Sequence, residues 1–128
     1  MNKFLFFILL LSALPLFSKA QSGYGQLQQV KLANIDSSFA SYTQVLANPR
    51  LSTGTVNCEV TEFTITFTVK DGPSYGPYPT KGFMLTDEER IMIKNLRNDL
   101  VKVQVSNISM RCDGQLVQAQ SFSLYMGY

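Results

Sequence analysis

Two cysteines, Cys58 and Cys112, are the side chains of this 128-residue chain with the clearest chemical consequence. In an exported chain, which residues 1–20 indicate here, two cysteines are most simply explained by one disulfide. The alternative is a pair of buried free thiols. A zinc site is disfavoured because the sequence has no histidine, and two thiolates alone do not complete the usual ligand set.

Side chains that could perform catalysis do not form a recognisable pattern. The lack of histidine removes the commonest general base, and no feature of the sequence marks a serine–lysine pair. The adjacent acids Asp87, Glu88 and Glu89 are better explained as charges that stabilise the start of a helix. We therefore expect a protein that is not an enzyme and that uses no cofactor and no metal.

Aromatic side chains held by a stiff backbone are the best candidates for contact with a partner. Residues 71–82 contain three prolines and three glycines, which predicts a loop with few accessible conformations. Tyr75, Pro77 and Tyr78 in this stretch could bind a partner at low entropic cost. The alternative is that the rings cover the open end of the core, and residues 125–128 allow the same two interpretations.

The first twenty residues have the pattern of a secretory signal peptide. A short basic start containing Lys3 precedes the apolar residues 4–17, and Ser18 and Ala20 are small residues suited to a cleavage site. The apolar run is too short for a typical transmembrane helix. We expect cleavage after Ala20, a periplasmic or secreted location, and no stable membrane insertion of the mature chain.

Charge and length limit the partners and the number of domains. Removal of residues 1–20 takes away Lys3 and Lys19 and leaves equal numbers of basic and acidic side chains. Because no basic cluster remains, we expect no nucleic-acid partner. The rest of the chain suits one core, which we divide into a partly flexible N-terminal segment, residues 21–44, and a β domain, residues 45–128.

The middle of the chain predicts one clear strand. Apolar residues alternate with polar ones from Phe63 to Val69, which is typical of a strand with one face in the core. Val56, Cys58 and Val60 have the opposite phase, which predicts a bulge or bend between the two sets. In that phase both cysteines point inward.

One helix is predicted clearly, and a second segment allows a helix as one of two interpretations. Thr86 and Glu89 form a capping box for a helix over about residues 87–97, with Asn98 as a left-handed stop. This helix is expected to bury Ile91, Leu96 and one of Met92 and Ile93. Nearer the N-terminus the pattern is ambiguous: Val30 and Leu32 could form a strand edge, and Asp36 could cap a short helix that carries Phe39, Tyr42, Val45 and Leu46.

The C-terminal third predicts a hairpin with a defined register. Asp113–Gly114 is a strong two-residue turn signal. It pairs apolar residues throughout: Met110 with Val117, Ile108 with Ala119, Val105 with Phe122, Val103 with Leu124, and Val101 with Met126. The predicted fold class is therefore mainly β, an antiparallel sandwich-like domain with one short helix and a C-terminal Asp–Gly hairpin.

From about residue 45 to residue 126 the order of these signals resembles the C-terminal domain of the gliding-motility and type IX secretion protein GldM of Bacteroidetes. The matching stretches are residues 60–65, Gly82, residues 96–99, residues 103–108, Asp113–Gly114 and residues 121–124. The resemblance implies a mainly-β extracytoplasmic binding module directed at envelope components. The chain departs from that family in its signal peptide, which stands in place of a membrane anchor, and in Cys58, which has no counterpart.

Together, these features lead us to expect a non-enzymatic extracytoplasmic protein-interaction module. Its partner would be an envelope component, as in gliding or type IX secretion, or a second copy of the chain. The alternative expectation is a small secreted ligand-binding or inhibitor protein.

Overall fold

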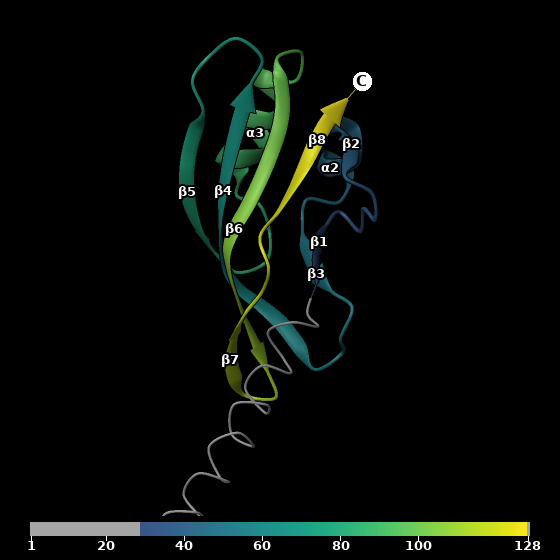
Figure 1. Ribbon diagram of the computed structural model, residues 1–128, viewed down its shortest axis with the longest axis vertical. Coiled ribbons are helices and arrows are strands. Elements are labelled where there is room, and N and C mark those ends of the chain that lie inside the picture. The colour runs from purple at the N-terminus through teal and green to yellow at the C-terminus, as the bar shows by residue number, and fades with distance from the viewer. Residues whose placement is uncertain (1–28, 128) are drawn as a thin grey trace, which may run out of the picture.

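A computed structural model describes residues 29–127 of the chain (Figure 1). The expected signal peptide and its cleavage site lie outside these residues. The fold is mainly β, as predicted, but it contains two helices where one was expected. The bounds of the elements are β1 (Val30–Leu32), β2 (Phe39–Ser41), α2 (Tyr42–Ala47), β3 (Leu51–Thr53), β4 (Cys58–Val69), β5 (Tyr75–Lys81), α3 (Asp87–Leu96), β6 (Leu100–Cys112), β7 (Gln115–Gln118) and β8 (Phe122–Gly127).

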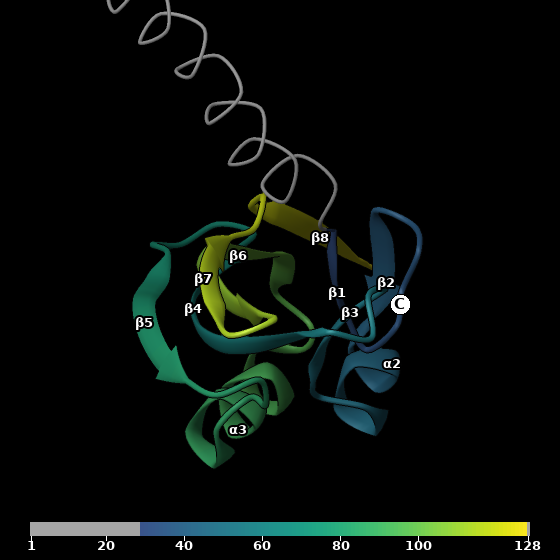
Figure 2. The same ribbon diagram turned by 90° about the horizontal axis from the view of Figure 1, so that it is seen from below.

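Two sheets of unequal size build the domain. The larger sheet has six strands in the order β2–β8–β6–β4–β5, with β7 also paired to β6, and the smaller sheet is β1 paired to β3. The large sheet curves as one layer, and α2, α3 and the β1–β3 pair lie together on its concave face (Figure 2). All pairs in the sheets are antiparallel except β2 with β8.

The core lies between these two layers and includes residues from both. Leu32 of β1 and Val45 of α2 are as fully buried as Ile65 and Phe67 of β4, and all belong to one apolar cluster. The core therefore continues across residue 45, where the sequence analysis divided the N-terminal segment from the β domain.

Strand β4 follows the predicted alternation. Phe63, Ile65, Phe67 and Val69 are buried, and the residues between them are only partly buried. The register with β6 shifts on both sides of Glu62, which confirms the predicted bulges. The expectation for Val56 is wrong: this side chain is 99% exposed, because it precedes β4 in a turn.

The C-terminal hairpin has the predicted register. The β6–β7 and β6–β8 ladders contain the Met110–Val117, Val105–Phe122 and Val103–Leu124 pairs. Asp113 and Gly114 both have positive φ, 50° and 80°, as the turn type that suits a two-residue hairpin requires. Asn107, with φ of 48°, lies where the apolar phase changes.

Helix α3 begins as predicted, and Ile93 and Leu96 pack on the core as expected, but Ile91 does not. The Thr86–Glu89 capping box is present. Glu89 is buried because it also accepts a 2.5 Å hydrogen bond from the Thr80 hydroxyl, so the buried face holds Glu89 and Ile93. Ile91, expected in the core, is 56% exposed. The expected left-handed stop at Asn98 is also wrong, because Asn98 does not have a positive φ.

Helix α2 begins later than the sequence analysis expected. Ser41, not Asp36, is the N-cap, and its side chain and that of Gln44 form a second capping box. Phe39 therefore lies in β2 before the helix. Asp36 instead forms an ion pair with Lys31.

Residues 71–82 are not a loop throughout, because residues 75–81 form the edge strand β5. Gly82 donates its N–H to the Thr61 carbonyl of β4, at 2.7 Å. Because backbone groups alternate sides along a strand, residues at odd-numbered positions turn their nitrogens away from β4, and these include Pro79 and Pro77. Proline at these positions removes no hydrogen bond from the ladder. This is why a proline-rich stretch can pair as a strand here.

Candidate functional site

The predicted disulfide is present. Cys58 and Cys112 lie directly opposite each other on β4 and β6, with 4.1 Å between their Cα atoms. Cys112 is 1% exposed and belongs to the core. The bond therefore joins the two longest strands at the end of the sheet where β7 turns back.

The three candidate contact residues on β5 have different surroundings. Tyr78 is partly buried, and its ring packs at a tilted angle against Phe67, with 6.3 Å between the ring centroids. Tyr75 and Pro77 are exposed. Tyr78 therefore contributes to packing against the core, while Tyr75 and Pro77 are available at the sheet edge.

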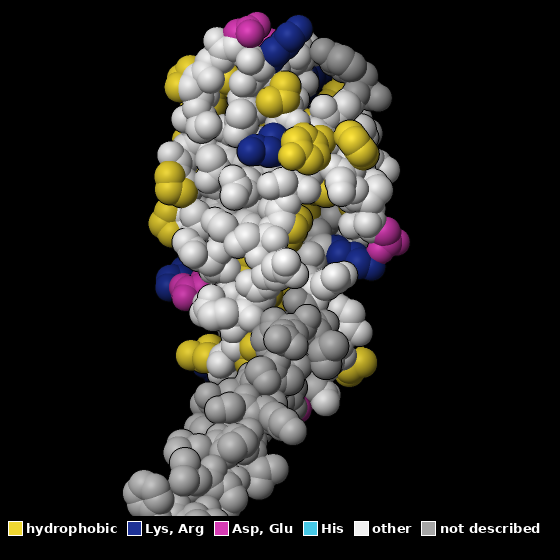
Figure 3. Space-filling view, in the orientation of Figure 1, with side chains coloured by type: hydrophobic (Ala, Val, Ile, Leu, Met, Phe, Trp, Pro, Cys, Tyr) yellow, Lys and Arg dark blue, Asp and Glu magenta, His cyan; other side chains and the backbone are white. Residues whose placement is uncertain are grey.

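A second aromatic surface lies at the other side of the large sheet. Phe39 of β2 and Tyr125 of β8 are paired directly, and their rings are 6.0 Å apart at a tilted angle. Phe39 is 71% exposed and Tyr125 is 49% exposed. Lys102 of β6 is the cross-strand neighbour of Tyr125. We call Phe39, Tyr125 and Lys102 the aromatic patch; Figure 3 shows hydrophobic side chains beside a basic one over this part of the sheet.

Strand alternation explains why the aromatic patch faces solvent. Leu124 and Ala40 are buried, so the next residue on β8 and the preceding residue on β2 point to the opposite face of the sheet. The C-terminal aromatic tail had been noted in the sequence as a possible contact surface. The contribution of Phe39 was missed, because β2 has only three residues and gives no periodic signal.

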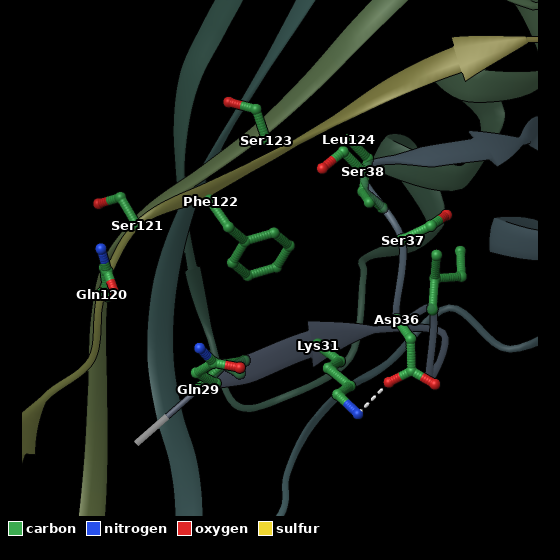
Figure 4. Close-up of a pocket in the computed structure, with 12 residues that line it drawn as sticks. Gln29, Lys31, Asp36, Ser37, Ser38, Gln120, Ser121, Phe122, Ser123 and Leu124 are labelled. Atoms are coloured by element: carbon green, nitrogen blue, oxygen red, sulfur yellow. Dashed lines mark hydrogen bonds and ion pairs between the residues drawn. The ribbon is translucent and has the colours of Figure 1, made fainter. Parts of the chain in front are cut away.

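A cavity of about 290 Å³ lies between β1 and β8, below the point where β2 pairs with β8. The Phe122 ring points into the gap, while the side chains of Ser121 and Ser123 point away from it (Figure 4). The Lys31–Asp36 ion pair lies on the opposite wall. No sequence signal indicated this cavity, because its walls come from segments about ninety residues apart.

The carboxyl group of Glu62 has a shifted pKa. The hydrogen bond from Lys81 to Glu62, 2.7 Å long, and the positive charge of the lysine lower the pKa of Glu62 below its ordinary value. A lowered pKa in the folded state means that the pair stabilises the fold above the ordinary pKa of glutamate. That contribution is lost as the pH falls through the lowered value. Because the pair lies at the surface, where solvent screens both charges, the effect is small.

Residues 29–127 contain no group of three or more histidine, cysteine or acidic residues placed to hold a metal ion. Within the same residues no helix is long and apolar enough to cross a membrane. No protein-family model matches the chain, and no curated protein matches it. The function must therefore be inferred from the surfaces that the fold presents: the aromatic patch, the β5 edge and the cavity beside β8.

Proposed function

We propose that the protein is an exported, non-enzymatic protein-interaction module, accessory to a cell-envelope assembly of the gliding or type IX secretion kind. The aromatic patch is its main contact surface, and Tyr75 and Pro77 at the β5 edge form a secondary one. The exposed Phe39–Tyr125 pair is the observation that carries this proposal.

Large apolar rings that are exposed together favour a binding role. Aromatic side chains are enriched in the energetically dominant part of protein interfaces, and each ring fixes few rotatable bonds on binding. Both rings extend from paired strands, so the backbone holds them in place before a partner arrives. Lys102 beside them supplies one hydrogen-bond donor at the rim.

Two further observations support export and an envelope partner. Disulfides persist in oxidising compartments, and the Cys58–Cys112 bond agrees with a chain that leaves the cytoplasm. The resemblance to the GldM C-terminal domain supports a partner in the cell envelope. N-terminal sequencing of the exported protein tests the first point, and we expect it to begin at Gln21.

The interaction itself is tested by capture from envelope extract with three forms of the mature chain. These are the wild type, a double variant with Phe39→Ser and Tyr125→Ser, and a control with Ile91→Ser, which removes an equally exposed apolar side chain from α3. We expect one envelope protein to be enriched by the wild type and the control. The amount of partner captured by the double variant should fall about tenfold or more, which corresponds to the loss of one hot-spot contact.

Melting temperatures measured on the same samples separate binding from folding. All three forms should melt within a few degrees of one another, because each change is on the surface. Equal capture by all three forms would show that the aromatic patch is not the contact surface.

A further inference from the structure

One edge of β8 is hydrogen-bonded to β2 along only half of its length. Tyr125 donates its N–H to the carbonyl of Ser38 at 2.7 Å, where the chain enters β2. Backbone groups alternate sides along a strand, so Ser123 turns its N–H and C=O groups to the same edge. No described residue pairs with Ser123 there, because β2 pairs only with residues 125–127.

A second unused edge lies across the cavity. Just after β1, Ala33 donates its N–H to the Arg50 carbonyl on the β3 side, at 2.9 Å, so Val30, three residues earlier, turns its backbone groups to the other side. Val30 lines the same cavity as Ser121 and Ser123. Figure 4 shows β1 and β8 running in roughly the same direction on either side of the gap. We call this gap, between Val30 and residues 121–123, the slot.

The chemistry of the slot suits an extended peptide. Backbone groups of Val30 and Ser123 face the gap from its two sides, and the Ser121 and Ser123 side chains point away from it (Figure 4). Phe122, Ile35 and Val30 offer an apolar wall for one inserted side chain. The charges of Lys31 and Asp36 satisfy each other, so an uncharged segment is favoured. Strand addition at an open sheet edge is a recurrent mode of peptide recognition.

The segment that best fits these requirements precedes the slot in the chain. Residues 21–28 carry no charged side chain, include the apolar side chains Tyr24 and Leu27, and lead directly into Gln29, which lines the cavity. To enter the slot of its own molecule the segment would have to reverse direction at residues 26–28. Those residues are Gln, Leu and Gln, and they include none of the Gly, Asn or Asp residues that two-residue hairpin turns favour.

We infer that residues 21–28 of one copy insert as an added strand into the slot of a second copy, between β1 and β8. The inserted strand joins the two-stranded and six-stranded sheets of the second copy. Because every copy carries both a segment and a slot, two copies can exchange segments in a closed dimer, or the contacts can continue head-to-tail into larger species. The inference rests on the proposed export, which frees Gln21 by cleavage, and it does not use the aromatic patch.

The test compares three forms of the mature chain, residues 21–128, by sedimentation velocity at increasing concentration. One variant carries Tyr24→Pro and Gln26→Pro, which removes two backbone donors from the segment. Its matched control carries Tyr24→Ala and Gln26→Ala, which removes the same side chains but keeps the N–H groups. We expect dimers and larger species for the wild type and the alanine control, and monomers for the proline variant. A synthetic peptide of residues 21–28 should dissociate the wild-type oligomers.

Hydrogen exchange locates the contact. The amide of Ser123 should exchange at least tenfold more slowly in the wild-type oligomer than in the proline variant. A wild type that stays monomeric with a fast Ser123 amide overturns the inference, as does a proline variant that associates like the wild type. A monomer in which Ser123 is protected shows insertion within one molecule and also overturns it. Capture of an envelope partner by the aromatic patch does not depend on residues 21–28, so we expect the proline variant to retain it. Failure of this inference therefore leaves the proposed function standing, and the capture experiment tests that function separately.

Discussion

Loss of the Cys58–Cys112 bond is the perturbation whose size the structure defines best. The bond joins residues 54 positions apart. For a closed loop of that length, the chain-entropy model gives a stabilisation of about 4 kcal/mol at 25 °C. We therefore expect a variant with both Cys58→Ala and Cys112→Ala to lose about 4 kcal/mol of unfolding free energy. Alanine is preferred to serine at position 112, because a hydroxyl buried there would add its own desolvation cost.

The measurement is equilibrium unfolding in urea, followed by far-ultraviolet circular dichroism because the chain has no tryptophan. With a slope of about 1.5 kcal/mol per molar urea, the transition midpoint should fall by roughly 2–3 M. Wild-type protein kept reduced provides an independent comparison, and its unfolding free energy should fall by a similar amount. A loss below about 1 kcal/mol in both samples would refute the reasoning, because it would mean that the bond does not restrict the unfolded chain.

Two further predictions concern β5. Tyr78→Ala should lower the unfolding free energy by about 2 kcal/mol because its ring packs on Phe67, whereas Tyr75→Ala should cost less than about 1 kcal/mol; similar losses in thermal unfolding would contradict this difference. Gly76→Ala should cost about 2 kcal/mol, because φ is +113° and a Cβ would lie 2.9 Å from a backbone oxygen of β4. Gly54→Ala, where a Cβ meets nothing within 4 Å, should change stability by less than about 0.5 kcal/mol, and equal urea midpoints for the two glycine variants would argue against the strain.

The C-terminal hairpin could be predicted in detail because two local signals agree. The Asp113–Gly114 turn sets the pairing, and the apolar residues of both strands change phase at the same level. A wrong register would have exposed one whole apolar set. The same logic holds for β4, where the alternation from Phe63 to Val69 is long enough to be unambiguous.

Elements that depend on distant contacts could not be predicted. The prolines of β5 indicate a loop when read alone, and only the position of the strand at the sheet edge makes them acceptable. On α3, Glu89 takes a buried position because Thr80, on a neighbouring strand, donates to it. From the sequence, Glu89 is explained as a helix-start charge and Ile91 is placed in the core.

The candidate contact surfaces could be predicted only where aromatic residues stand out in sequence. Tyr75, Tyr78 and the C-terminal tail were identified in this way, although the packing of Tyr78 on Phe67 was not specified. Phe39 required knowledge that a short strand pairs in parallel with β8. The sequence does contain one signal for this: Ser41 and Gln44 have the spacing of a capping box. That spacing predicts a helix start at Ser41, after Phe39, so Phe39 would not have been placed in the helix.

The prolines at the β5 edge also bear on contacts between copies of this chain. Outside residues 1–20, basic and acidic side chains are equal in number, so this part of the chain supplies little charge repulsion between molecules. An exposed sheet edge in such a chain would invite edge-to-edge aggregation. Pro77 and Pro79 present no N–H groups there, so a colliding strand finds no regular ladder to extend. The outer edge of β5 is thereby protected by its backbone chemistry, without help from net charge.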